Sequence, residues 1–116
     1  MGLFKDNYPV WKDYNLEKAI KAVEKETDQA KMYEITNDAA LAPVRLLAAT
    51  KLTDQSLAQR TYADLYNRSL FEEDRKRAVE KMTDQKLLTY ISKKDLDPGI
   101  RDEAKLRLYW LNKGKT

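Results

Sequence analysis

The sequence contains no cysteine and no histidine. Without cysteine, the chain can form no disulfide, no thiolate nucleophile and no thiolate metal site. Without histidine, it lacks the commonest general base and the commonest nitrogen ligand for zinc, copper and iron. Because these absences argue against most nucleophilic and metal-dependent chemistry, we predict no enzymatic activity, no cofactor and no metal site.

Glycine and proline are scarce, with three of each in 116 residues, which argues against a turn-rich β architecture. Long apolar runs are also absent. No segment approaches the roughly 20 apolar residues that a membrane-spanning helix needs, and the first residues lack the apolar region of a secretory signal. We therefore expect a cytoplasmic protein without a membrane partner.

The excess of positive charge is small, because the chain has 22 basic and 19 acidic residues and a net charge of +3. A dedicated nucleic-acid binder normally shows a stronger basic footprint. Charged residues make up 35% of the chain, with both signs interleaved, which is typical of solvated helix faces.

An internal repeat is the strongest feature that is present. The tripeptide Thr-Asp-Gln begins at Thr27, Thr53 and Thr83, so its starts are 26 and then 30 residues apart. A partial copy precedes them, because residues 22–29 differ from residues 78–85 at one position. Periods of this length indicate an array of small supersecondary units that stack to form a core.

A second pattern closes each unit. It consists of an arginine, an alanine three residues later, a basic residue three positions further and then an apolar residue. The copies span residues 45–52, 75–82 and 101–108. Its alanines are Ala48, Ala78 and Ala104. A small side chain at one fixed offset predicts that neighbouring helices approach closely and in the same way in every unit.

Each unit is predicted to fold as two helices separated by a polar break. We expect the threonine of Thr-Asp-Gln to cap the first helix, with the following aspartate favoured by the helix dipole. In the second helix, Val44, Ala48 and Leu52 are four residues apart and share one face.

The middle unit departs from the pattern. It is four residues longer, and Asp74 stands where Val44 and Ile100 stand in the other units. We predict that a longer inter-helix loop holds the extra residues, with Leu70 or Phe71 as the displaced apolar anchor. Aromatic residues near both ends are expected to cap the array, namely Tyr8, Trp11, Tyr14, Tyr109 and Trp110.

Residues 97–104 read Asp-Pro-Gly-Ile-Arg-Asp-Glu-Ala, and this run resembles the second helix of a HEAT repeat. Residues 43–48 are similar but lack the preceding aspartate. The short unit opened by Thr-Asp-Gln resembles HEAT-like repeats of bacterial proteins, over residues 16–112. The resemblance implies an all-α fold, a right-handed α-α superhelix of about three helix pairs with a partial N-terminal unit. It says almost nothing about function.

We therefore expect a single HEAT-like repeat domain over residues 1–116. Its predicted parts are an N-terminal cap (1–15), a partial repeat (16–26) and three repeats (27–52, 53–82 and 83–112).

Six basic residues recur at two repeat positions and are the candidate partner-binding residues: Arg45, Arg75, Arg101, Lys51, Lys81 and Arg107. As a stripe, they would suit an acidic peptide or a phosphate backbone. Alternatively, the arginines pair with acidic side chains of adjacent loops, and the second row complements the helix dipole in the last turns. The repeat geometry favours this structural interpretation.

The predicted function is a non-enzymatic protein–protein interaction module or scaffold that uses the inter-repeat groove lined by the second helices. The alternative is a nucleic-acid-binding module that uses the basic stripe. Binding to nucleic acid would weaken steeply as salt rises, whereas binding through apolar anchors would not.

Overall fold

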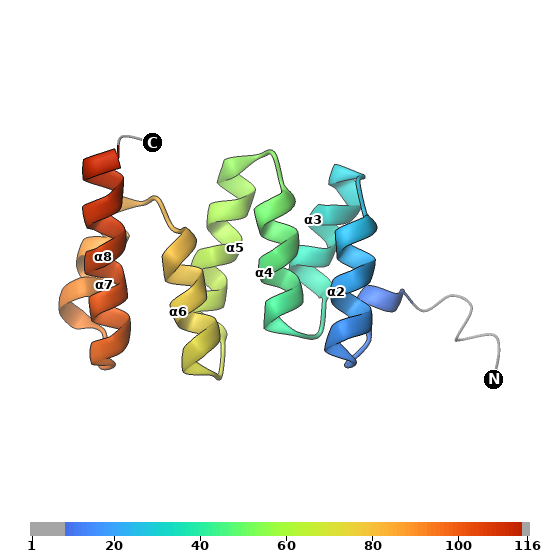
Figure 1. Ribbon diagram of the computed structural model, residues 1–116, viewed down its shortest axis with the longest axis horizontal. Coiled ribbons are helices and arrows are strands. Elements are labelled where there is room, and N and C mark those ends of the chain that lie inside the picture. Colours follow the sequence, from blue (N-terminus) through green and yellow to red (C-terminus); the bar gives the residue numbers. More distant parts are fainter. Residues whose placement is uncertain (1–8, 115–116) are drawn as a thin grey trace. The chain divides into compact units, whose positions relative to one another are not determined.

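The computed structural model describes residues 9–114, and every regular element in that range is a helix. A short 3-10 turn, η1 (Val10–Lys12), is followed by seven α-helices (Figure 1). These are α2 (Leu16–Lys25), α3 (Gln29–Asp38), α4 (Ala42–Lys51), α5 (Gln55–Arg68), α6 (Glu72–Lys81), α7 (Gln85–Lys94) and α8 (Pro98–Gly114). The predicted all-α class is confirmed. Every link between successive α-helices is three residues long.

The first helix of each pair is capped by an aspartate. The side chains of Asp28, Asp54 and Asp84 each accept a hydrogen bond at 3.0 Å from the backbone N–H two residues later. The prediction that the preceding threonines are the caps was wrong by one residue. A carboxylate is a strong acceptor for these unpaired N–H groups, and its charge suits the positive end of the helix dipole.

The extra four residues of the middle pair lie in its first helix. Helix α5 has 14 residues, whereas α3 and α7 have 10 each. The predicted longer loop was therefore wrong, and so was the predicted anchor, because Leu70 is 92% and Phe71 69% exposed. Four residues are close to one helical turn, so they lengthen a helix while each face keeps its direction.

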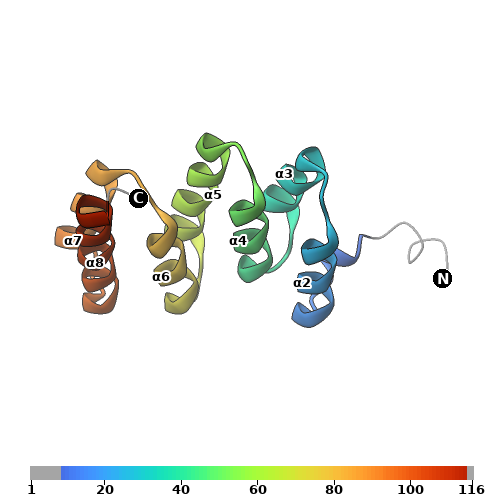
Figure 2. The same cartoon turned by 45° about the horizontal axis from the view of Figure 1, so that its top comes forward.

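The chain divides into two compact units, an N-terminal unit (residues 1–61) and a C-terminal unit (residues 62–116). In the N-terminal unit, α4 packs against α2 and α3, and η1 contacts both α2 and α3. In the C-terminal unit, α8 packs against α6 and α7. Within that unit, the loops before α6 and α8 lie at the same end (Figures 1 and 2).

The repeated alanines lie in the core as predicted. Ala48, Ala78 and Ala104 all have no exposed surface. The helix faces that carry them hold other buried apolar residues, including Val44 and Ile100. Asp74, at the equivalent place in α6, is half-buried. A small side chain at the centre of each face lets the next helix approach closely.

The aromatic residues near the ends differ from one another in burial. Trp11 of η1 is 6% exposed, which agrees with the predicted capping role, whereas Tyr14 is 78% exposed. Tyr8 lies outside the described residues. Tyr109 and Trp110 of α8 pack edge to face with ring centroids 5.2 Å apart, but each remains about half exposed. Between residues 9 and 114, we find no helix with the length and apolar character of a membrane span.

Candidate functional site

The three repeat-equivalent arginines lie against the ends of the first helices. Each belongs to a second helix and donates a guanidinium hydrogen bond to a backbone carbonyl at the end of its own partner helix. The acceptors of Arg45, Arg75 and Arg101 are the carbonyls of Thr36, Tyr66 and Asp95, at 2.6, 2.9 and 2.6 Å. The last carbonyls of a helix have no partner inside it, so each arginine closes the turn between the two helices of a pair.

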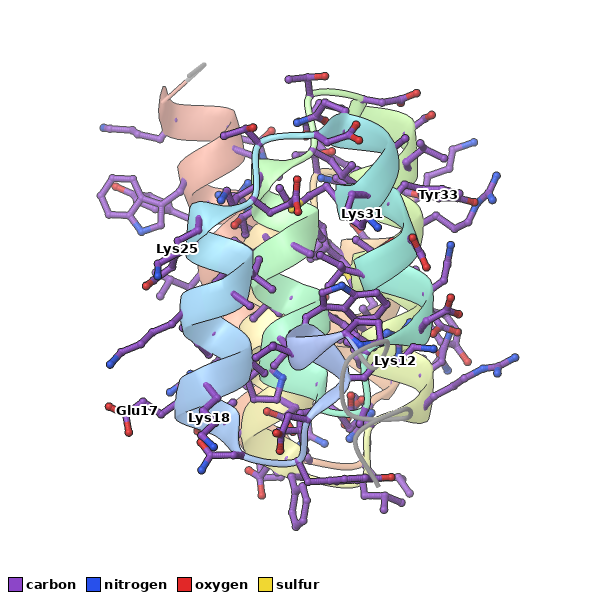
Figure 3. All side chains as sticks on the ribbon, turned by 90° about the vertical axis from the view of Figure 1, so that its right-hand side faces the viewer. Lys12, Glu17, Lys18, Lys25, Lys31 and Tyr33 are labelled. Atoms are coloured by element: carbon purple, nitrogen blue, oxygen red, sulfur yellow. The ribbon has the colours of Figure 1, made fainter. Side chains whose placement is uncertain are left out.

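Two members of the second basic row, Lys51 and Arg107, connect successive second helices. The ammonium group of Lys51 donates to the carbonyls of Val23, Glu24 and Glu26 at 2.6, 3.0 and 2.9 Å. Arg107 likewise donates to the Met82 carbonyl, at the end of α6, at 2.7 Å. Lys25 has the equivalent place in α2, and the element that precedes α2 in the described residues is the short turn η1. It is exposed and projects away from α3 (Figure 3).

These contacts give the basic residues a structural role. Five of the six candidates are half-buried, and Lys81 is exposed. Lys51 and Arg107 complement the dipole of their own helix, as predicted. They also complement the dipole of the neighbouring helix, whose C-terminal end they contact. The arginines bind backbone carbonyls, and Arg75 also binds the side chain of Asp95. Partner binding by the six residues stays a prediction.

Asp95 is the centre of a buried polar cluster in the C-terminal unit. Its carboxylate is 3% exposed and accepts hydrogen bonds from the Tyr66 hydroxyl and, at 2.7 Å, from Arg75. The guanidinium of Arg75 also lies 4.7 Å from the centre of the Tyr66 ring. The cluster therefore fixes the loop between α7 and α8 to α5 and α6.

The titration of this cluster follows from its contacts. Burial raises the pKa of Asp95, but hydrogen bonds from Tyr66, the Asp97 amide and Arg75 outweigh it, so the pKa is lowered overall. Burial, together with the hydrogen bond to the Asp95 carboxylate, raises the pKa of Tyr66 to about 12. Asp95 is therefore a stable anion at neutral pH and Tyr66 a stable donor.

A hollow of about 310 Å³ adjoins the cluster. Its lining residues are Tyr66, Arg75, Tyr90, Lys94, Asp95, Leu96 and Asp97. Tyr90 is 61% and Leu96 96% exposed, so they give the hollow an apolar rim around a polar base. This volume is at the lower end of the range for small-ligand pockets, and it suits one side chain of a partner.

Asp97, which lines the hollow, has the carboxylate of Glu72 as a neighbour. Asp97 lies within hydrogen-bonding reach of Glu72, and this contact is the main reason why the pKa of Glu72 is raised and that of Asp97 lowered. A Cβ atom on Gly99 would lie 3.2 Å from an Asp97 carboxylate oxygen and 3.6 Å from one of Glu72. The start of α6 therefore lies beside the loop that precedes α8.

In the C-terminal unit, the loops before α6 and before α8 have exposed apolar tips. Leu70 and Leu96 are the second residues of their three-residue loops and are 92% and 96% exposed. In the N-terminal unit the same place is held by Ala40. The conformation of this loop therefore needs no large side chain at its tip. Burial within this chain does not explain why the two tips carry leucine.

The described residues, from 9 to 114, contain no cluster of three acidic side chains of the kind that holds a metal ion. Asp97 is also engaged by the helix that follows it, since it accepts the Gly99 N–H at 2.8 Å.

The sequence interpretation did not single out Tyr90, Leu96 or Glu72 as site residues, and it used Leu70 and Asp97 only for structural roles. A signal was available, because aligning the three inter-helix loops places Ala40, Leu70 and Leu96 in one column. The four extra residues of the middle unit were assigned to this loop from the sequence, so the three loops were not aligned.

We compared the chain with protein-family models, with curated proteins and with solved structures, and none of them matches. The resemblance to HEAT-like repeats therefore stays a prediction.

Proposed function

We propose that this chain is a non-enzymatic protein-binding module that uses the loop end of its C-terminal unit. The surface comprises the loop tips Leu70, Phe71 and Leu96 with Tyr90 and the adjoining hollow, and is called the loop-tip surface below. We keep the cytoplasm as the expected location.

One observation supports this proposal most directly. Two leucines are almost fully exposed at equivalent loop tips, where the same fold elsewhere in the chain uses alanine. Leu96 also lines the hollow, and exposed apolar side chains beside a hollow are typical of protein-interaction sites. The groove that the sequence predicted lies along the second helices, whereas this surface includes loops and α7.

The basic residues support this choice over nucleic acid. The arginines of both units, as well as Lys51 and Arg107, are hydrogen-bonded to backbone carbonyls. A phosphate backbone would have to compete with those carbonyls for the same donors.

The test is affinity capture from a native lysate, with and without nuclease, using wild type and a Leu70→Ala/Leu96→Ala variant. We expect a nuclease-resistant protein that the variant fails to capture. A matched control, Leu106→Ala/Trp110→Ala, removes half-exposed apolar side chains from α8 instead.

Loss in the control alone would place the binding surface on α8 and refute the loop-tip surface. Nuclease-sensitive capture would favour the nucleic-acid alternative. Circular dichroism of both variants shows whether the fold is retained.

A further inference from the structure

The charge next to the loop tips indicates which kind of partner would bind them. We infer that the loop-tip surface binds a peptide segment in which a bulky apolar side chain adjoins a lysine or arginine. This inference rests on the proposed function and adds the chemistry of the partner.

The apolar half of the partner is matched by the hollow. Tyr90 and Leu96 form its exposed apolar rim, and the buried Asp95 cluster holds the loop in a fixed position. A preformed hollow binds an apolar side chain without a large ordering cost, because the loop that carries Leu96 is already fixed by Arg75 and Tyr66.

The basic half of the partner is matched by Glu72 and Asp97. Carboxylate oxygens of Asp97 and Glu72 lie 3.2 and 3.6 Å from the place that a Cβ atom on Gly99 would occupy, so the two groups are neighbours. The hydrogen bond with Asp97, and after it the repulsion between two like charges, raises the pKa of Glu72. Glu73 adds to this repulsion, and Lys76 offsets it only in part. A cationic side chain bound beside both carboxylates would remove the repulsion, so this position favours lysine or arginine over a neutral group.

Lys94 sets the position of the partner's cation. It also lines the hollow, four residues after Tyr90 on α7. Its own positive charge disfavours a second cation nearby. The cation of the partner is therefore expected at the Glu72 and Asp97 side, with the apolar side chain between that point and Tyr90.

The fold itself does not require this combination. In the N-terminal unit, residues 39–42 read Ala-Ala-Leu-Ala and occupy the same loop and first helical position as Ser-Leu-Phe-Glu at residues 69–72. That loop carries no charge and no exposed leucine tip. A purely structural role would not explain why both the apolar tips and the acidic pair occur together in the C-terminal unit.

The experiment is a selection of random 12-residue peptides displayed on phage against the full chain. Selected peptides are then synthesised and titrated by fluorescence anisotropy. We expect enrichment of a Leu, Ile, Phe or Trp adjacent to Lys or Arg. Leu96→Ala should weaken binding about tenfold, and Glu72→Lys about five- to tenfold. A matched control, Glu80→Lys, reverses another exposed charge of α6 and should change the Kd less than about twofold.

The outcomes separate the two proposals. Peptides that depend on Leu96, but lack basic residues and ignore Glu72→Lys, would overturn the inference and leave the proposed function standing. Peptides that bind the Leu70→Ala/Leu96→Ala variant as tightly as wild type would overturn both, and so would a selection without enrichment. Equal effects of the Glu72 and Glu80 variants would show a diffuse charge effect and overturn the inference.

Discussion

Charged side chains in this protein donate hydrogen bonds to backbone carbonyls at the ends of helices. Lys51 and Arg107 come from different repeats, yet each donates hydrogen bonds to the end of the preceding second helix. The final carbonyls of those helices lack partners within the helix. A basic residue at one repeat position therefore connects neighbouring second helices once within each compact unit.

The role of Lys51 is tested by Lys51→Met, which keeps the aliphatic stem and removes three hydrogen bonds. We expect the free energy of unfolding to fall by about 1–2 kcal/mol, because hydrogen bonds to charged groups are among the stronger ones. Urea denaturation measures the change. Lys25→Met is the control, since Lys25 has the same repeat position but is exposed. Equal losses in both variants would contradict the capping role.

Tyr66 predicts how stability depends on alkaline pH. Its pKa in the folded protein is raised from 10 to about 12, so the folded state holds the proton more tightly than the unfolded chain. The stabilisation is complete below pH 10 and is lost as the pH rises toward 12, by an amount on the order of 2 kcal/mol.

Tyr66→Phe should make that alkaline decline shallower in urea denaturation series at increasing pH. Burial also raises the pKa of Tyr62, so part of the decline remains. Tyr109→Phe is the control because Tyr109 is half exposed. An unchanged slope in Tyr66→Phe would show that Tyr66 does not titrate differently in the folded state.

Among the helices, regular linkers coexist with one lengthened first helix, α5. Three-residue links join every pair of successive α-helices, and the insertion in the middle repeat appears as about one extra turn of α5. A whole turn preserves which residues face the core, whereas a longer loop would have moved the following helix. The cap residues define where each of these helices begins.

The cap assignment is tested by Asp28→Ala beside Thr27→Ala. We expect the aspartate variant to lose about 0.5–2 kcal/mol of unfolding free energy, because the Ala30 N–H loses its side-chain acceptor. The threonine variant should stay within about 0.5 kcal/mol of wild type, since Thr27 is exposed. Thermal or urea unfolding followed by circular dichroism distinguishes them. A larger loss from Thr27→Ala would restore the threonine as cap.

Helix α6 carries a polar residue in an apolar position. Burial raises the pKa of Asp74, which holds the place that Val44 and Ile100 fill in α4 and α8. Asp74→Val should therefore increase the free energy of unfolding by about 0.5–2 kcal/mol, because a partly desolvated carboxylate is replaced by the residue that the repeat uses elsewhere. The urea midpoint is the measurement. A decrease would mean that Asp74 makes a hydrogen bond that the fold needs.

Across the whole molecule, two sets of apolar residues that recur in the repeats have opposite environments. The alanines of the second helices are fully buried, whereas the leucines at the loop tips are almost fully exposed. The hydrophobic contribution of a side chain to stability is roughly proportional to the apolar area that it removes from water. The buried alanines therefore stabilise the fold, whereas the exposed leucines contribute little.

This contrast predicts that Leu70→Ala/Leu96→Ala unfolds within about 0.5 kcal/mol of wild type, because neither side chain is buried. Ala78→Leu, in contrast, should lose about 1–3 kcal/mol through overpacking of a closed site. Both values come from urea denaturation of the full chain. A marked loss in the leucine variant would mean that the loop tips support the fold, and the loop-tip surface would then need another explanation.

The sequence by itself determined the helical class, the pairing of helices and the buried alanines, because these depend on local periodicity and on residues that recur at fixed offsets. It did not determine which residue of Thr-Asp-Gln caps the helix, since Thr and Asp are both good caps and one residue of register separates them.

Only the tertiary structure decided which groups the charged side chains contact and which apolar side chains are exposed. Lys51 and Val23 are 28 residues apart, and Tyr66 and Asp95 are 29 apart, so their contacts exist only after helices from different repeats have packed. The loop-tip surface likewise required knowing that the middle insertion extends a helix. If the four extra residues are assigned to the loop instead, Ala40, Leu70 and Leu96 no longer align. The spacing along the chain does not reveal which element contains added residues.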